Sequence, residues 1–492
     1  MSTIRRIAKN TAVLLVAQVA SYLLAFFYAM YAARYLGAAG YGILSFALAF
    51  TGIFGVLADL GLSSLTIREV ARDKSLALKY LANVGLMKII LAAVTFGLIA
   101  LIINLMGYPQ ETITVVYLLG LYVVLAAFTQ MFYTIFQAFE RMEFQAIGQM
   151  LNAALILGGV IFAIKHSFSV IGFASLYVIA SAVALGYSLA VMKLKFSNPS
   201  SASATKVVEF DWSFWKPMIK KALPFFLVGA LDLISLRIAT IMLSAMKGDE
   251  AVGWYSASFQ LMQTLMFIPA AFLAALYPVV SRFYVSSGES LRFVYQKSFK
   301  YLSLLGLPIA VGTTILADRI ILGIFQEGFA PSIIALRVLI WAVPIVFLTG
   351  VFGTILASIN RQGLAARIVL AYTILNVVMN SILIPRYSYV GASIVIVITS
   401  LMAFVPLFIV LSKLGYKISI PKLIFRPVIA SGLMALFLFF SARLSLWLLI
   451  PLAAIIYFGM LILLRVFSKE DLNLFREIAT PEPGAKGGMP PS

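Results

Sequence analysis

Cysteine is absent from this 492-residue chain, and histidine occurs once, at His166. The absence of cysteine excludes disulfide bonds, thiol nucleophiles and cysteine-ligated metals. A single histidine also excludes an intramembrane histidine relay and a metal site with several histidines. Charged residues are scarce, at 11%, whereas a soluble globular protein has roughly 25%. Hydrophobic residues make up 62% of the chain, which predicts an all-α polytopic membrane protein.

Catalytic and nucleotide-binding motifs are missing as well. No paired carboxylates, phosphate-binding glycine loop, metal-ligand cluster or Ser/His/Asp set occurs at a useful spacing. We therefore expect a protein that is not an enzyme, has no cofactor and transports by a secondary or passive route. The net charge of +19 does not indicate nucleic acid, because the basic residues lie in short loops between apolar runs. That pattern is typical of membrane topology and of attraction to anionic headgroups.

Apolar runs long enough to cross a bilayer recur along the whole chain. We expect about fourteen transmembrane helices, near residues 11–33, 41–67, 80–106, 113–139, 144–165, 170–194, 222–246, 251–276, 298–322, 333–358, 364–385, 390–412, 424–441 and 444–466. With both termini in the cytoplasm, 28 of the 37 Lys and Arg residues fall in cytoplasmic segments, six in outer segments and three within helices. This asymmetry satisfies the positive-inside rule.

A polar break after the sixth span divides the chain. Residues 197–203 have the composition of a flexible linker, and residues 210–221 interleave aromatic and basic residues as an interfacial helix does. We expect an N-terminal six-helix bundle (1–196), a cytoplasmic linker with an interfacial helix (197–221), a C-terminal six-helix bundle (222–413), an extra helix pair (414–467) and a cytoplasmic tail (468–492).

A faint internal repeat supports two pseudo-symmetric bundles. A glycine–aromatic pair followed by Ser-Phe opens the second span at Gly40 and recurs at Gly253, 213 positions later. Because each bundle has an even number of helices, the bundles are parallel repeats, and transporters bind substrate between such repeats. No proline falls within the first six predicted spans, whereas Pro224, Pro269 and Pro344 are among those in or at the ends of later spans, which predicts kinks in the second bundle.

Two charged residues lie deep in the seventh span. Asp232 is about ten residues into the span, near the bilayer midplane, and Arg237 follows more than one helical turn later, so the two side chains point in different directions. A charge at that depth costs several kcal/mol unless it faces a partner or a wet cavity. Two interpretations are open: an ion pair with a neighbouring helix, or the lining of a pathway for an anionic substrate.

Other polar groups are candidates for the same cavity. Lys88 in the third span and Asp59 in the second could pair with each other, or Lys88 could reach cytoplasmic phosphates. Gln260 and Gln263 lie on one face of the eighth span, where they could bond sugar hydroxyls or a neighbouring helix. Arg34, at the outer end of the first span, completes the set of candidates.

Several motifs resemble the polysaccharide-type flippases of the multidrug/oligosaccharidyl-lipid/polysaccharide (MOP) superfamily. The first half carries Ala33-Arg34-Tyr35-Leu36-Gly37, Gly40-Tyr41-Gly42, Asp59-Leu60-Gly61-Leu62 and Arg68-Glu69-Val70-Ala71-Arg72. The second half carries Ile241-Met242-Leu243, Ala251-Val252-Gly253-Trp254-Tyr255-Ser256-Ala257 and Ala275-Leu276-Tyr277-Pro278. The order of the motifs and the topology are more specific than any single motif.

The resemblance implies a flippase that moves lipid-linked oligosaccharide across the plasma membrane by alternating access between its two bundles. It implies lipid-linked glycan, membrane lipids and glycan-assembly enzymes as partners, and no nucleic acid. Arg237 would contact the diphosphate. Coupling to a sodium or proton gradient would use Asp232 or Asp59. Family members often carry an acid two positions after the matching arginine, whereas this chain has Ala239 there.

The main alternative is a cation-coupled multidrug exporter of the same superfamily, which needs an acidic, aromatic-lined cavity. The basic residues within the spans, Lys88, Arg237 and Arg337, weigh against it. A lipid scramblase or a structural membrane protein is a more distant alternative.

Overall fold

The computed structural model describes residues 3–196, 212–286, 288–359, 361–441 and 443–467, and those residues form helices without strands. The first half contains α1 (Thr3–Asp59), α2 (Leu62–Arg72), η1 (Lys74–Leu76), α3 (Ala77–Leu105), α4 (Gln110–Ala138), α5 (Met142–Lys165), α6 (Val170–Val191) and η2 (Met192–Phe196). The second half contains α7 (Trp212–Lys247), α8 (Asp249–Thr264), α9 (Phe267–Ser286), α10 (Gly288–Phe325), η3 (Glu327–Phe329), α11 (Ser332–Leu339), α12 (Ala342–Ser358) and α13 (Gln362–Lys413), followed by α14 (Ile420–Phe440) and α15 (Leu446–Leu463).

Twelve helical stretches of the described chain are long and apolar enough to cross a membrane. Two of them, Val13–Arg72 and Gly363–Lys413, have 60 and 51 residues, far more than the roughly 20 that one crossing needs. Helix α1, in the first stretch, is interrupted at Gly37, and helix α13, in the second, at Ser388, since both residues have non-helical backbone angles. Dividing both stretches there gives fourteen crossings. The protein is therefore an all-helical, multi-pass membrane protein, as predicted.

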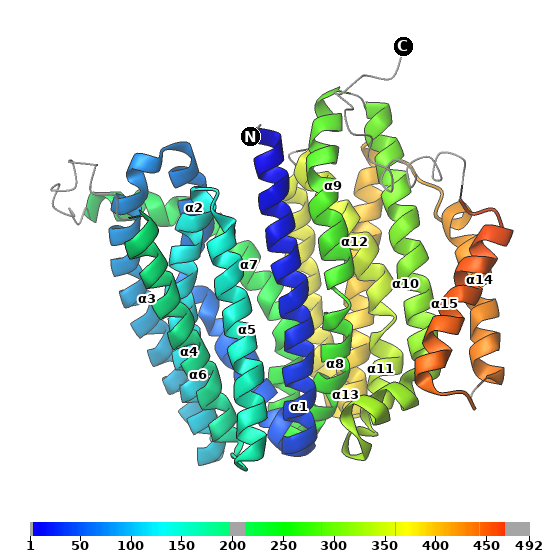
Figure 1. The fold of residues 1–492 in the computed structure, drawn as a ribbon, viewed down its shortest axis with the longest axis horizontal. Helices are drawn as coiled ribbons and strands as arrows, with labels where there is room; N and C mark the ends of the chain where they lie inside the picture. The colour runs from blue at the N-terminus through cyan, green and yellow to red at the C-terminus, as the bar shows by residue number, and fades with distance from the viewer. Residues whose placement is uncertain (1–2, 197–211, 287, 360, 442, 468–492) are drawn as a thin grey trace.

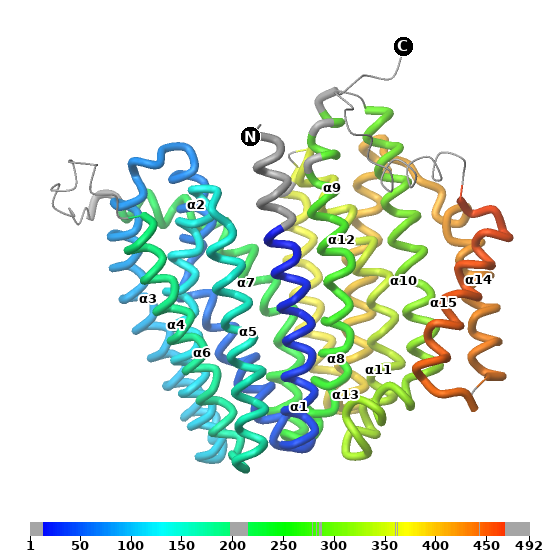
Figure 2. Tube along the Cα trace, viewed as in Figure 1, coloured from blue at the N-terminus to red at the C-terminus, as the bar shows by residue number. Residues whose placement is uncertain are grey.

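The two halves of the chain lie side by side (Figure 1). Helices α3 to α6 pack among themselves on one side, and α7 to α13 do so on the other, with α14 and α15 against α10 at the edge. The first helix joins the halves, because α1 packs against α4 and α5 as well as α7 and α8. Figure 1 shows that α1 begins and α15 ends on the same side of the molecule, as an even number of crossings requires, and the tube in Figure 2 follows the same arrangement of helices. The exact domain boundaries stay a prediction.

Three predicted spans contain breaks that the hydropathy pattern did not indicate. The predicted span 41–67 ends at Asp59, because Leu60 and Gly61 have positive φ, and α2 then starts as a separate helix. Helix α2 is amphipathic: Leu62, Leu65 and Val70 are buried. The spans near 251–276 and 333–358 are each split, between α8 and α9 and between α11 and α12.

The prolines explain where two of these breaks fall. Pro269 and Pro344 are the third residues of α9 and α12, where a missing N–H costs no helical hydrogen bond. The expected interfacial helix is part of α7, which contains Pro217 and Pro224 and runs through the predicted boundary at residue 222. Residues 197–203 and 468–492 lie outside the described residues.

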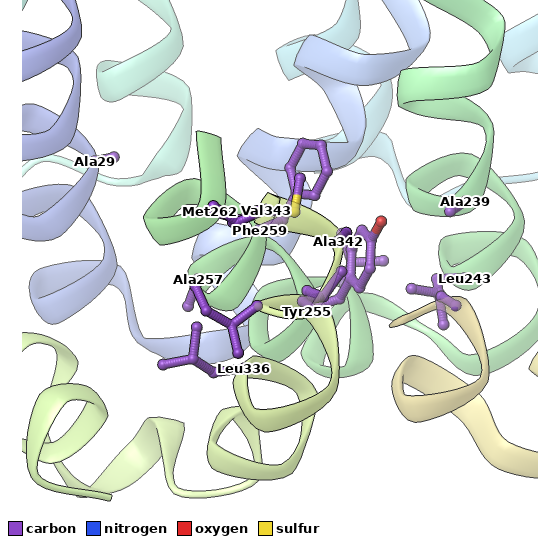
Figure 3. Packing of buried hydrophobic residues seen from close by; sticks show 14 of the residues in the cluster. Ala29, Ala239, Leu243, Tyr255, Ala257, Phe259, Met262, Leu336, Ala342 and Val343 are labelled. Carbon is purple, nitrogen blue, oxygen red and sulfur yellow. The ribbon is translucent and has the colours of Figure 1, made fainter. Parts of the chain in front are cut away.

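The packed centre lies where α1, α7, α8, α11 and α12 meet. Figure 3 shows Tyr255 of α8 between α12 residues and the α7 turn that carries Ala239 and Leu243. Tyr255, Leu243, Ala257 and Ala342 have no exposed surface. The small side chains of Ala257 and Ala342 allow neighbouring helices to approach closely here.

Candidate functional site at the junction of the two halves

The two halves touch backbone to backbone at the end of the molecule opposite the N-terminus. A Cβ atom added to Gly42 would lie 1.8 Å from the Asp249 carbonyl oxygen, and one added to Gly253 would lie 2.0 Å from that of Ala38. Only glycine permits these approaches. We call the four residues Ala38, Gly42, Asp249 and Gly253 the glycine seam.

The glycine seam is pseudo-symmetric. Adding 211 to Ala38 and Gly42 gives Asp249 and Gly253, so each contact is the counterpart of the other. The same offset relates Gly37 (φ 68°, ψ −177°) to Gly248 (φ 83°, ψ −178°), the left-handed residues that precede the seam. The predicted repeat is therefore present, but the structural offset is 211 rather than 213. A contact of this kind corresponds to the self-complementary interface of a two-fold dimer.

Arg34 ties the halves together beside the glycine seam. Its Nε donates to the Ile324 carbonyl at 2.6 Å and its Nη2 to that of Gly323 at 2.7 Å. These carbonyls belong to the last turn of α10, where backbone acceptors lack helical partners and a cation is favourable. Tyr108 adds a further link, since its hydroxyl donates to Ser244 Oγ of α7 at 3.0 Å. Arg34 thus links the two halves at this end of the molecule, and its role as a cavity residue stays a prediction.

Lys88 and Asp59 form an ion pair, one of the two alternatives considered for them. Lys88 Nζ lies 2.7 Å from Asp59 Oδ1 and 3.0 Å from the Ala127 carbonyl. The Lys88 side chain is 1% exposed and that of Asp59 28%. Asp59 also accepts hydrogen bonds from the backbone N–H and hydroxyl of Ser63, which caps the start of α2. Both charges are therefore satisfied by the protein itself.

Arg237 is different. Within the described part of the chain it makes no hydrogen bond or ion pair, although it is half-buried in the middle of α7. Four tyrosines lie within electrostatic range of it, from three other helices: Tyr28, Tyr41, Tyr122 and Tyr255. The hydroxyl of Tyr255 is buried and has no hydrogen-bond partner among the described residues. The guanidinium thus has donors to offer a ligand.

A polar cavity of about 470 Å³ adjoins this tyrosine group. It lies between α1, α4 and α5, and it shares Tyr28 and Tyr122 with the surroundings of Arg237. Among the residues whose side chains are described, its lining contains amides, hydroxyls and apolar groups but no charged side chain: Leu14, Gln18, Ser21, Tyr22, Ala25, Tyr28, Tyr122, Gln145, Gln149, Asn152, Ala153 and Ile156. Along α1 it extends from Leu14 to Tyr28, about 21 Å at 1.5 Å per residue.

The remaining candidates lie elsewhere. Asp232 faces α13, where the Tyr372 hydroxyl donates to its Oδ1 at 3.2 Å, and the hydroxyls of Ser235 and Thr373 lie 2.6 Å apart nearby. The structure does not bring Asp232 and Arg237 together. Gln260 and Gln263 are half-buried near the end of α8, and within the described chain their side chains make no hydrogen bond.

The amides of the cavity were not among the sequence candidates. Gln145, Gln149 and Asn152 are spaced i, i+4 and i+7 on α5, which places them on one helical face. Polar side chains sharing one face of an apolar helix were a usable signal, because they are costly against lipid. No feature of the sequence indicated which other helix they would face.

Comparisons with known proteins agree with this architecture. A family model described as "Polysaccharide biosynthesis protein" matches residues 7–284, and one described as MatE matches residues 224–382. The chain is 22% identical over 364 residues to the "Probable low-salt glycan biosynthesis flippase Agl15" of Haloferax volcanii, which covers 74% of each chain.

Solved structures share the fold. The "Lipid II flippase MurJ, inward closed conformation" superposes with a TM-score of 0.74 at 13% identity and covers 94% of this chain and 99% of that one. An "Inward-facing conformation of a multidrug resistance MATE family transporter of the MOP superfamily" gives a TM-score of 0.64 at 16% identity and covers 81% and 96%. The resemblance found in the sequence is confirmed, since the first family model spans more than half of the chain. The chain belongs to the polysaccharide biosynthesis protein family.

Proposed function

We propose that this protein moves a lipid-linked oligosaccharide across the plasma membrane by alternating access, without changing it chemically. The observation that carries the proposal is the pairing of a charge-free polar cavity with Arg237, an intramembrane cation without a protein partner in the described chain. A diphosphate-linked glycan needs both: hydrogen-bonding groups for its sugars and a cation for its phosphates. Membership of the family and similarity to a glycan flippase support the choice of substrate.

The geometry also suits one half of a transport cycle. The glycine seam and Arg34 close the end of the molecule opposite the N-terminus, while the cavity reaches from Tyr28 toward the start of α1. With both termini in the cytoplasm, as the positive-inside rule predicts, this state receives substrate from inside. Opening the seam and closing the cavity would release the glycan outside.

The exporter alternative has less support. A cation-coupled drug exporter needs carboxylates to attract its cargo, and the cavity lining has none among the described residues. Similarity to a multidrug transporter structure shows a shared fold and does not favour that cargo. For coupling to a sodium or proton gradient we propose Asp232, because Asp59 is already paired with Lys88.

Transport in proteoliposomes tests the proposal. A short-chain lipid-diphosphate-linked oligosaccharide and a cationic drug would be supplied to the same preparation, and movement of the glycolipid alone is expected. Arg237→Ala should reduce movement at least tenfold while leaving thermal stability near wild type, because the side chain has no hydrogen-bond or ion-pair partner to lose among the described residues. Movement of the drug alone would assign the chain to the exporters, and unimpaired flipping by Arg237→Ala would remove this residue from the site.

A further inference from the structure

The amides of α1 and α5 line the same cavity as the tyrosines. The lining contains Gln18 and Ser21 of α1 and Gln145, Gln149 and Asn152 of α5, and we call these five residues the amide wall. Two of their polar atoms, Ser21 Oγ and Asn152 Oδ1, are covered by neighbouring atoms and have no hydrogen-bond partner among the described residues. Burying such atoms without a partner is unfavourable, so rotation of these side chains toward a ligand that supplies the missing hydrogen bonds would be favoured.

We propose that this amide wall is the glycan subsite and that it selects an uncharged sugar, carrying hydroxyl or acetamido groups, next to the diphosphate. The inference rests on the proposed flippase function and adds the class of sugar. Amide side chains both donate and accept hydrogen bonds, as sugar hydroxyls do. The phenol rings of Tyr22 and Tyr28 offer apolar surface to the C–H face of a sugar ring.

The same wall disfavours an acidic sugar in that position. A uronate carboxylate could accept hydrogen bonds from the amide N–H groups, but its charge would be buried without a cation among the described lining residues to neutralise it. Arg237 lies beyond Tyr28 and Tyr122, at the place the diphosphate would occupy. Separate groups therefore bind the two parts of the substrate: Arg237 binds the phosphates through its charge, and the amide wall binds the sugar through uncharged hydrogen-bonding groups.

The full-length protein in proteoliposomes tests this with three probes: a short-chain polyprenyl diphosphate without sugar, one bearing an N-acetylhexosamine and one bearing a hexuronic acid. An added pyrophosphatase, which cannot cross the membrane, reports the fraction that has been moved. Wild type should move the N-acetylhexosamine lipid about tenfold faster than the uronic acid lipid. Equal rates for these two would overturn the selection.

Two variants locate the selection at the wall. Gln149→Met and Asn152→Leu keep side-chain size and remove the amides, so each should slow the N-acetylhexosamine lipid about tenfold and leave the sugarless lipid unchanged. Gln130→Met, on α4 and outside the cavity lining, is the matched control. An equal loss for sugar-bearing and sugarless lipids would show a structural role for the amides and overturn the subsite. Failure of wild type to move any of the three lipids would instead overturn the proposed function.

As a second readout, the N-acetylhexosamine lipid should raise the melting temperature of wild type more than that of Gln149→Met.

Discussion

The proposal that the glycine seam holds the outer side closed can be tested quantitatively. In Gly253→Ala the new Cβ would lie 2.0 Å from the Ala38 carbonyl oxygen, so α1 and α8 must separate by about 1.4 Å to reach an ordinary contact of 3.4 Å. The obstructing atom belongs to the backbone and cannot rotate away. Overpacking of this size typically costs about 1–3 kcal/mol. If the contact exists only in the state with the outer side closed, the variant should shift the equilibrium between this state and the state with the outer side open about 5–150-fold toward the open state.

The helix-propensity gain of alanine over glycine, about 1 kcal/mol, does not affect this equilibrium, because it applies equally to both states. Gly186→Ala in α6 is the matched control, since nothing lies within 4 Å of its added Cβ. We expect Gly186→Ala to leave the equilibrium unchanged, and Gly42→Ala to act as Gly253→Ala does, because the two contacts are counterparts.

The assay is a distance measurement between spin labels, which the absence of cysteine makes straightforward. Labels at His166→Cys and Tyr387→Cys report the outer side, and labels at Lys195→Cys and Lys413→Cys report the inner side. Gly253→Ala should lengthen the outer distance and shorten the inner one. A folded variant with unchanged distances would refute the reasoning, because the seam would then be a permanent joint rather than a closure.

Three further outcomes follow from the contacts described. Arg34→Gln removes two hydrogen bonds to the end of α10 and should lengthen the outer and shorten the inner spin-label distance, with a change of about tenfold in the populations of the two states. Arg34→Lys should restore only part of the wild-type population, because a lysine cannot donate two parallel hydrogen bonds as a guanidinium does. Asp59→Asn leaves the buried ammonium of Lys88 without its carboxylate partner and should lower the free energy of unfolding by about 3–5 kcal/mol. Lys88→Met should cost less, because Asp59 is partly exposed and keeps its hydrogen bonds to Ser63. Thermal unfolding in detergent measures both losses, and equal losses would contradict this asymmetry. Asp232→Asn should reduce the dependence of transport on a sodium or proton gradient, and an unchanged dependence would exclude this carboxylate from coupling.

The number and order of the spans could be predicted because hydropathy and the distribution of basic residues depend on local sequence alone. Interruptions within spans could not. The ends of α1 and α8 fall inside apolar runs, where a change in backbone direction leaves the composition unchanged. Gly61, with its positive φ, was a partial signal, but the sequence does not show that the Ala222 carbonyl of α7 would lie 2.5 Å from a Cβ added there.

The repeat shows the same limit in another form. Sequence similarity suggested an offset of 213, since aromatic residues follow Gly40 and Gly253. The offset in the structure is 211. At this offset Gly37 and Gly248 have matching backbone angles, and Gly42 and Gly253 make matching close backbone contacts. Similarity between side chains is a weak guide to the repeat offset here, because the matched contacts are made by backbone atoms, which every residue has.

The two intramembrane cations differ in the groups that surround them, and the sequence does not reveal those groups. Lys88 and Arg237 both lie in apolar helices and carried the same cost in the sequence argument. Lys88 meets a carboxylate and a carbonyl within 3.0 Å, so the protein already compensates its charge, and a substrate would have to compete with Asp59 for it. Among the described residues, those in electrostatic range of Arg237 are tyrosines, which are neutral acceptors, and two of them, Tyr28 and Tyr122, also line the cavity. A cation kept in that setting costs stability in the resting state, and binding of an anionic group would recover that cost. For this reason we propose Arg237 rather than Lys88 as the residue that contacts the diphosphate.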